Sequence, residues 1–267
     1  MNNTSDLDLM LNALTEIIQE EKAKGITPQT PLKPAQPNLS SVLARITPLP
    51  SEALFLGMAN DGLPVLLNLF DPVPGPLLIA GDSSTGKTRL LQTIACGVEN
   101  LHAPELVKYC VVTTKPDEWQ TFYGKEHNLG IYKTDEENTA ELIKSLAEWA
   151  HNNKGDGQCV LLFVDGMNAF NNLDPLTQQN LRWLLLRGPS RRVWIFATLD
   201  TDHAKAQMEW LELFRTRLFS FVEDAEHAKV LAGKNLDHLT PAEEFAMRED
   251  DNLLKFWLPS IEERLSK

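Results

Sequence analysis

One short segment of this sequence carries residues whose types and spacing could hold a polyphosphate. Residues 81–88 read GDSSTGKT and match the pattern G-x-x-x-x-G-K-[ST] in full. Glycine lets the backbone wrap around phosphates without a Cβ clash, and successive N–H groups then receive the anion. Lys87 would reach the β- and γ-phosphates of ATP, and the Thr88 hydroxyl would be a ligand of Mg²⁺. We assign the nucleotide contacts to Gly81, Asp82, Ser83, Ser84, Thr85, Gly86, Lys87, Thr88 and Arg89.

A carboxylate for the second protein contact to Mg²⁺ follows a short apolar run. Residues 159–165 read CVLLFVD, which predicts a buried strand that delivers Asp165 to the edge of a sheet. There the carboxylate could hold the metal directly or through water. Lys87 and Asp165 are therefore the predicted catalytic residues, and Thr88 and Asp165 are the predicted Mg²⁺ ligands.

The hydrolytic centre departs from expectation directly after that aspartate. Many NTPases of this kind carry Glu at the next position, where it deprotonates the attacking water, but this chain has Gly166. Loss of a positioned general base typically lowers a rate by about 10²–10⁴-fold. At the end of the next strand, the place of a polar γ-phosphate sensor holds Leu199, with Asp200 or Asp202 as substitutes if the strand end is shifted. Glu118 is a candidate replacement base. The sequence thus predicts slow hydrolysis or none.

Alternating strands and helices must position these residues. Two strands turned by Asn60-Asp61-Gly62 predict a β-hairpin before the loop, and EFAMREDDNLLKFWLP predicts another near the C-terminus. Between them, the pattern predicts an α/β domain with a mainly parallel sheet between helices. The segments expected to alternate there are strand 76–80, helix 89–100, strand 106–114, helix 139–153, strand 160–164, helix 177–186 and strand 193–197.

The N-terminal part of the chain has a different pattern. Residues 1–25 predict an amphipathic helix, since apolar residues recur at three- and four-residue spacing between Leu7 and Ile18. Residues 26–45 predict a proline-rich linker, and residues 46–267 the NTPase domain. The helix could dock on a partner protein or cover apolar surface of its own domain, and both readings stay open.

Composition limits the partners and the compartment. The formal charge is −12 and the pI is about 5.0, which argues against a chain that coats nucleic acid by itself. We expect a cytoplasmic protein with no membrane contact, because no apolar run reaches the roughly 20 residues that span a bilayer. Cys96, Cys110 and Cys159 lie far apart without metal-ligand spacing, which predicts reduced core residues.

Arginines form a local concentration in this acidic chain. Four lie within eleven residues, and they could line the interior of a ring, supply an arginine finger to a neighbouring subunit, or belong to an ordinary solvated helix face. Two later arginines compete for the finger role. The four are Arg182, Arg187, Arg191 and Arg192, and the competitors are Arg215 and Arg217.

The order of these segments resembles the RecA-like motor domain of the FtsK/HerA family of P-loop ATPases. The similarity spans residues 54–259 and rests on FLGMANDGLPVLLNL, GDSSTGKT, VVTTKPDEW, CVLLFVDGMNAF, VWIFATLDTD and FRTRLFSFVEDAEHAKVLAG. The resemblance implies a homo-oligomeric, hexameric ring that binds ATP between subunits and moves double-stranded DNA through its pore. The chain departs from the family at Asp165-Gly166, where motors have Asp-Glu, and at Leu199, where they have Gln.

Three functions remain open at this stage. The first, which we favour, is an ATP-binding switch or assembly subunit with weakened hydrolysis. The second is an active DNA-translocating ATPase whose base comes from elsewhere. The third is a structural adaptor that uses nucleotide only for stability.

Overall fold

The computed structural model describes residues 36–153, 157–249 and 252–261. By its contacts the chain divides into Met1–Gln36 and Pro37–Lys267, and every element described below belongs to the second unit. The helix expected over 1–25 and the first half of the linker expected over 26–45 lie outside the described residues. Helix α2 (Leu39–Ile46) begins inside the range expected as linker, where the Asn38 side chain caps it by accepting from the Ser41 N–H at 2.7 Å.

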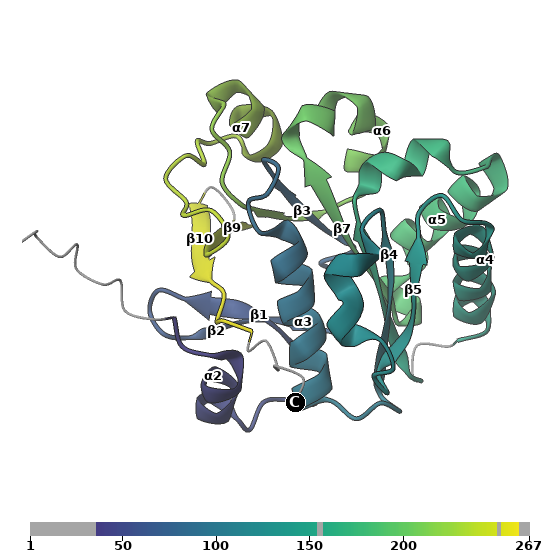
Figure 1. Cartoon of the computed structure of the whole chain (residues 1–267), viewed down its shortest axis with the longest axis horizontal. Helices are drawn as coiled ribbons and strands as arrows, with labels where there is room; N and C mark the ends of the chain where they lie inside the picture. Colours follow the sequence, from purple (N-terminus) through teal and green to yellow (C-terminus); the bar gives the residue numbers. More distant parts are fainter. Residues whose placement is uncertain (1–35, 154–156, 250–251, 262–267) are drawn as a thin grey trace, which may run out of the picture. The chain divides into compact units, whose positions relative to one another are not determined.

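The described strands form one mixed sheet (Figure 1). They are β1 (Ala53–Ala59), β2 (Pro64–Asn68), β3 (Leu77–Gly81), β4 (Val107–Thr113), β5 (Asn128–Lys133), β6 (Cys159–Asp165), β7 (Val193–Asp200), β8 (Thr216–Phe219), β9 (Glu244–Glu249) and β10 (Asn252–Trp257). Their order is β2-β1-β10-β9-β8-β3-β7-β6-β4-β5. Neighbours from β8 to β5 are parallel and the others are antiparallel, which confirms the predicted mainly parallel α/β sheet.

Both predicted hairpins are present and they meet. β1 pairs with β2 across the turn that contains Asn60-Asp61-Gly62, and β9 pairs with β10. β10 also pairs with β1, where Met58 lies opposite Trp257. The two hairpins thus lie side by side at one end of the sheet. They join its parallel part where β9 pairs with β8.

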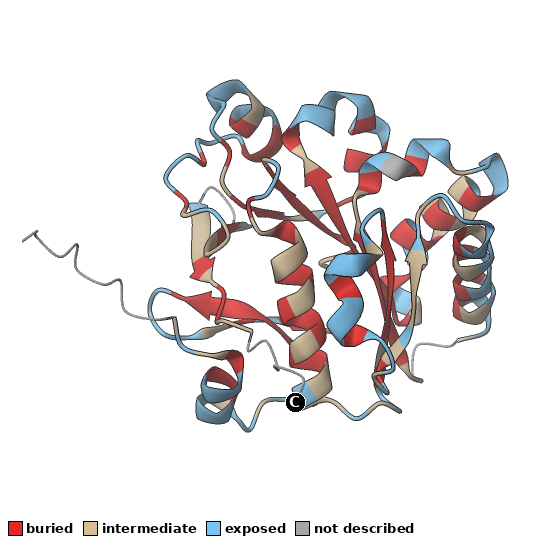
Figure 2. Cartoon of the chain, viewed as in Figure 1, coloured by how far each residue is buried: buried red, intermediate tan, exposed pale blue. Residues whose placement is uncertain are grey.

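Helices cover both faces of the sheet. They are α2, α3 (Lys87–Leu101), α4 (Glu137–Asn152), α5 (Pro175–Arg187), α6 (Met208–Leu211) and α7 (Ala225–Ala232), with 3₁₀ segments η1 (Pro116–Phe122), η2 (Met167–Asn172), η3 (Pro189–Arg191) and η4 (Thr201–Gln207). α3 and η1 pack on one face, and α4 to α7 pack on the other. Successive residues of β3 alternate between these two apolar cores: Leu77 and Ile79 join the first, Leu78 and Ala80 the second. Figure 2 shows the resulting burial of the central strands.

The strand order explains how distant residues come together. β7 lies between β3 and β6, all three run parallel, and their carboxyl ends therefore meet at one edge of the sheet. Gly81 at the end of β3 lies opposite Asp200 at the end of β7. Thr113 at the end of β4 lies opposite Asp165. Open α/β sheets bind ligands at this kind of edge.

The cysteines behave as predicted from the sequence. Cys110 and Cys159 are free thiols buried in the two cores, and Cys96 is partly buried against one of them. Burial raises the pKa of the Cys110 and Cys159 thiols to about 12, because an apolar surrounding disfavours the thiolate. Neither thiol is therefore an activated nucleophile. Within the part of the chain that the structure describes, no helix combines the length and apolar character needed to cross a bilayer.

Candidate nucleotide site

The loop between β3 and α3 has a backbone that two of its glycines make possible. Gly86 has φ 92°, a left-handed conformation, and a Cβ on it would lie 2.6 Å from the Cα of Ala242. A Cβ on Gly81 would lie 1.8 Å from the Ser220 Oγ. Ser84 also has positive φ, at 61°. The loop is therefore held close to two later segments of the chain. A side chain at Gly86 would displace the backbone at Ala242, whereas one at Gly81 would displace the Ser220 side chain.

A cavity of about 500 Å³ opens beside this loop, which is within the range of small-ligand pockets. Seven of the predicted site residues line it: Ser83, Ser84, Gly86, Lys87, Thr88, Arg89 and Asp165. The rest of the lining comes from α3, the end of β4, η1 and the residues before it, the start of η2, and β7. These residues are Gln92, Thr113, Thr114, Lys115, Glu118, Gly166, Asn168, Thr198 and Asp200. The structure thus brings both halves of the predicted site together.

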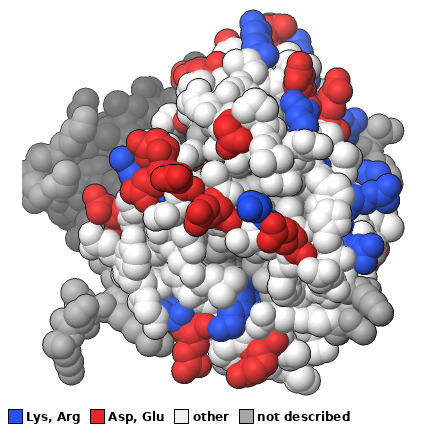
Figure 3. Space-filling view, turned by 90° about the vertical axis from the view of Figure 1, so that its right-hand side faces the viewer, with Lys and Arg blue, Asp and Glu red and all other residues white. Residues whose placement is uncertain are grey.

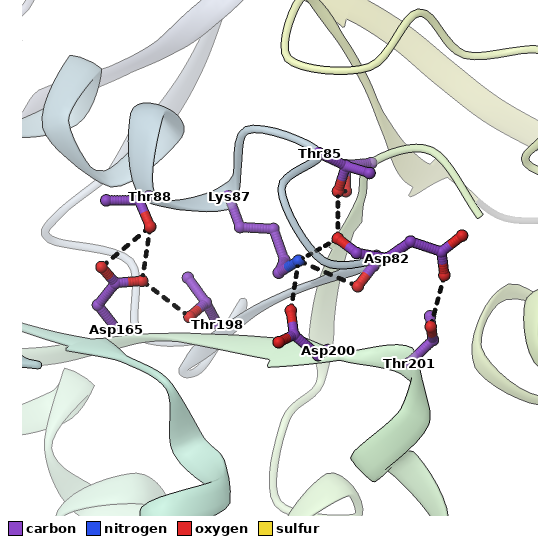
Figure 4. Close-up of polar contacts among 10 residues, drawn as sticks. Asp82, Thr85, Lys87, Thr88, Asp165, Thr198, Asp200 and Thr201 are labelled. Carbon is purple, nitrogen blue, oxygen red and sulfur yellow. Dashed lines mark hydrogen bonds and ion pairs between the residues drawn. The ribbon is translucent and has the colours of Figure 1, made fainter. Parts of the chain in front are cut away.

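Lys87 projects its ammonium group into the base of the loop (Figure 4). Its Nζ donates to the carbonyl oxygens of Gly81 at 3.1 Å and Asp82 at 2.5 Å, and it pairs with the Asp200 Oδ1 at 2.7 Å. Only 7% of the side chain is exposed, against 40% for Asp200. An ammonium group has three N–H donors, so this lysine is fully engaged by the loop and by β7.

Asp165 accepts hydrogen bonds from three directions. The Thr88 hydroxyl lies 3.0 Å from both carboxylate oxygens, the Thr198 hydroxyl lies 3.1 Å from Oδ1, and the Trp119 indole N–H lies 3.3 Å from Oδ2. Burial raises the pKa of Asp165 above its ordinary value, although these hydrogen bonds oppose the shift. A divalent cation at this carboxylate would favour its ionised form. The pair of Thr88 and Asp165 therefore fits the sparse protein ligand set that Mg²⁺ uses beside phosphates.

Trp119 was not predicted as part of the site. The ring is fully buried beside Phe163. Its indole N–H nevertheless reaches Asp165, so the ring also orients the predicted metal ligand. Sequence pattern gives no signal for this contact, because the 3₁₀ turn of η1 is what directs the ring toward β6.

Replacement of Trp119 tests this orienting contact. We expect Trp119→Phe to weaken the Mg²⁺ dependence of nucleotide binding about tenfold, since partners that orient a metal ligand typically contribute 10–100-fold to metal affinity. Titration of Mg²⁺ at fixed nucleotide concentration measures this effect. Trp194→Phe is a matched control, because Trp194 is equally buried but donates to the Leu69 carbonyl oxygen. An equal response of both variants would contradict the role of Trp119.

Three predicted contacts, Gly81, Asp82 and Thr85, do not line the cavity. The Asp82 N–H donates to the Phe221 carbonyl oxygen at 3.0 Å, and its carboxylate accepts from the Thr201 hydroxyl at 2.5 Å and from the Glu223 N–H at 2.8 Å. The Thr85 hydroxyl lies 2.6 Å from the Ser220 Oγ. Asp82 and Thr85 therefore tie the loop to the ends of β7 and β8.

The placement of Leu199 at the sensor position was wrong. Leu199 is 1% exposed and packs in the core with α4 to α7, because its side chain points to the opposite face of β7. Thr198 and Asp200 line the cavity instead. β7 extends through Asp200. The strand therefore ends later than expected, which is the alternative in which Asp200 takes the place of Leu199. Asp202 is exposed on η4 and lines a different hollow.

The position directly after Asp165 carries no side chain. Gly166 lines the cavity and has φ 113°, a conformation that disfavours any side chain. Glu118 also lines the cavity from η1, where its carboxylate is 43% exposed and pairs with Lys115 at 3.3 Å. Glu118 is therefore within the site but is held by a lysine at its rim.

The arginines do not form one basic surface. Arg192 is buried, donates to the Leu69 carbonyl oxygen at 2.9 Å and stacks over Phe70, at the opposite end of β7 from Asp200. Arg191 donates to the Asn153 carbonyl oxygen, and Arg182 pairs with Glu209 at 3.1 Å. The remaining three differ in exposure: Arg187 and Arg215 are exposed, and Arg217 is half-buried against two carbonyl oxygens.

Surface charge on one side of the domain is mainly acidic. Figure 3 views the side that carries α4 and α5, and it shows Asp and Glu side chains gathered across the middle of this face with Lys and Arg scattered around them. This side does not offer the continuous basic surface that phosphate backbones require.

Comparisons with known proteins place the fold. No protein-family model and no curated protein matches the sequence. Solved structures do match: ATPases 2 and 3 of Thermomonospora curvata EccC in complex with a signal sequence peptide have 15% identity and a TM-score of 0.68, covering 86% of this chain and 44% of that one. EssC ATPases 2 and 3 from Geobacillus thermodenitrificans have 14% identity and a TM-score of 0.67, covering 87% and 48%. The chain thus spans less than half the length of either protein.

A third solved structure extends the comparison. The pCW3 conjugation coupling protein TcpA, in a monomer form with ATPγS, has 14% identity and a TM-score of 0.63, and the match covers 85% of this chain and 70% of that one. The EccC and EssC structures that match are ATPase domains. The chain therefore has the RecA-like P-loop NTPase fold. Because the sequence identities are only 14–15%, these matches confirm the resemblance to the FtsK/HerA motor domain for the fold alone.

Proposed function

We propose that this chain binds a magnesium nucleotide, ATP or ADP, beside residues 81–88 and hydrolyses ATP slowly or not at all. One observation carries the proposal: Lys87, Thr88 and Asp165 converge on one cavity, while the residue after Asp165 is a glycine in a left-handed conformation. The first part of this observation supports binding. The second supports weak turnover.

The binding residues would have separate tasks. Lys87 and the loop N–H groups would hold the phosphates, and Thr88 and Asp165 would hold Mg²⁺, with Trp119 and Thr198 orienting the carboxylate. Bound Mg²⁺ would bridge phosphate oxygens and neutralise part of their charge. The match in fold to TcpA, which has been solved with ATPγS, supports a nucleotide as the ligand.

Weak hydrolysis would make the protein a switch or assembly subunit. Asp82 and Thr85 link the loop to the ends of β7 and β8, and Ala242 donates to the Thr85 carbonyl oxygen at 3.0 Å. A ligand that moves the loop would therefore move three segments of the chain. The predicted amphipathic helix in residues 1–25 would then engage a partner protein, and the domain would form a homo-oligomer.

Phosphate release from ATP tests the weak turnover. We expect less than about 0.1 s⁻¹, because many enzymes turn over near 10 s⁻¹ and loss of a general base lowers the rate about 10²–10⁴-fold. The assay is run with and without double-stranded DNA, on a sample of known mass in solution. A rate of several per second that Lys87→Ala abolishes would contradict the proposal.

The position of Glu118 favours a second candidate, an active ATPase. Translocation of double-stranded DNA would be its use if the resemblance to the FtsK/HerA motor domain extends to activity. The described cavity lining has three acidic residues, Asp165, Asp200 and Glu118. Glu118 lies close enough to Asp165 for its negative charge to contribute to the raised pKa of that carboxyl group. If Glu118 is the general base, Glu118→Gln would lower phosphate release about 10²-fold or more while nucleotide affinity stays within about threefold. Glu105→Gln, an exposed change at the other end of β4, is the matched control. An unchanged rate in Glu118→Gln would exclude this role.

A further inference from the structure

The end of β7 places the Asp200 carboxylate beside the Lys87 ammonium group, which would hold the phosphates. Asp200 pairs with Lys87 at 2.7 Å, and it is the anionic member of the three groups that Lys87 contacts. The other two are carbonyl oxygens of the loop. A metal role for Asp200 is not indicated, since its contact is with a cation.

The backbone fixes the position of Asp200. The residue lies opposite Gly81 in the parallel pairing of β3 and β7. The next residue, Thr201, donates its hydroxyl to the Asp82 carboxylate at 2.5 Å, so the strand end is tied to the loop from both sides (Figure 4). Asp200 can rotate its side chain, but its Cα cannot leave the site without breaking these contacts.

The charges around the cavity leave no surplus of positive charge. Its described lining has three acidic side chains, Asp165, Glu118 and Asp200, and three basic ones, Lys87, Arg89 and Lys115. A lysine in this kind of loop reaches both the β- and γ-phosphates. The γ-phosphate of a triphosphate would therefore approach the lysine on which Asp200 already lies, and two like charges at one site repel each other.

We propose that Asp200 biases this site toward a nucleoside diphosphate over a triphosphate. A diphosphate can use the loop N–H groups and replace a loop carbonyl oxygen as a partner of Lys87, while Asp200 stays paired with the lysine. A triphosphate must displace the Asp200 carboxylate from Lys87 or tolerate it beside the γ-phosphate. This preference rests on the proposed function, namely that the cavity binds a magnesium nucleotide at all.

Titration calorimetry with ADP and ATPγS, each with Mg²⁺, tests the preference. For the unmodified protein we expect ADP to bind about tenfold more tightly than ATPγS, the ratio that a difference of about 1.4 kcal/mol gives. Asp200→Asn removes the charge and keeps the size. It is expected to improve ATPγS binding about tenfold and ADP binding by less than about threefold, which would equalise the two ligands.

Two further variants complete the experiment. Asp202→Asn makes the same change of charge two residues later, on an exposed side chain, and is expected to leave the ligand ratio unchanged. Asp200→Ser is a second variant that removes the charge, in case the first does not fold, and thermal melting checks both.

The outcomes separate the two proposals. A ligand ratio that is the same in the unmodified protein, Asp200→Asn and Asp200→Ser would overturn the diphosphate preference while nucleotide binding itself stands. Tighter binding of ATPγS than of ADP by the unmodified protein would overturn it as well. If the unmodified protein binds neither ligand, the proposed function fails and this inference fails with it.

Discussion

Lys87→Ala is expected to lower nucleotide affinity about a hundredfold or more, because a hydrogen bond to a charged group contributes about 1.5–3 kcal/mol and Lys87 would make more than one to the phosphates. The variant also leaves the Asp200 carboxylate without the ammonium group that it contacts at 2.7 Å. Like-charge repulsion would then add to the loss. Calorimetric titration with ADP and Mg²⁺ measures the effect.

A second lysine of the same cavity provides the control for Lys87. Lys115 lines the cavity but its side chain is 72% exposed and pairs with Glu118 at the rim. We expect Lys115→Ala to change ADP affinity by less than about threefold, since exposed ion pairs contribute little. If the two variants lose affinity equally, Lys87 has no special role and the loop does not act as a phosphate site.

Asp165→Asn is expected to remove most of the Mg²⁺ dependence of nucleotide binding. In the unmodified protein, chelation of Mg²⁺ should weaken binding strongly, because Thr88 and Asp165 are the side chains placed to hold the metal. In the variant, affinity with Mg²⁺ should fall about a hundredfold, since even partners that only orient a metal ligand contribute 10–100-fold. Nucleotide titrations with Mg²⁺ and with a chelator give both values.

The fold of Asp165→Asn should be intact. The amide oxygen can accept the hydrogen bonds of Thr88 and Thr198, and the buried charge is removed, although the amide NH2 group cannot accept from the Trp119 N–H. Thermal melting therefore checks the fold of the variant. Asp117→Asn makes the same chemical change on an exposed residue of η1 and is the matched control. A variant at Asp165 that keeps the full response to Mg²⁺ would show that the metal is held elsewhere.

Much of the site could be predicted because its residues have strong local signals. The loop at 81–88 has a fixed spacing between glycine, lysine and threonine, and Asp165 follows an apolar strand. Strand and helix periodicity then predicted the parallel sheet, and short turn motifs predicted both hairpins. Each of these signals depends on residues close together in the chain.

The remaining parts depend on geometry that short segments do not encode. Leu199 was misplaced because the residue that faces the cavity is decided by the alternation along β7, and a shift of one residue reverses every side chain. Trp119 reaches Asp165 through a 3₁₀ turn that periodicity does not reveal. The pairing of β10 with β1 joins segments about 200 residues apart, for which a single sequence has no local signal.

The arginines are a second case in which the sequence pattern did not predict where the side chains lie. They are close together in the chain but not in their surroundings. Their clustering in the sequence left open a ring lining, an arginine finger or a solvated helix face. The four residues lie along α5 and the 3₁₀ turn that follows it, where side chains point in different directions. Arg192 is directed inward to backbone carbonyl oxygens, whereas Arg187 is exposed. Spacing alone could not separate these two environments.

Titration of ADP into the unmodified protein, with Mg²⁺ and with a chelator in its place, decides whether the cavity holds a magnesium nucleotide. We expect one binding site per chain, with an affinity that falls when Mg²⁺ is removed. An absence of detectable ADP or ATP binding in the presence of Mg²⁺ would contradict it, because Lys87, Thr88 and Asp165 would then meet in one cavity without holding the ligand that their chemistry fits.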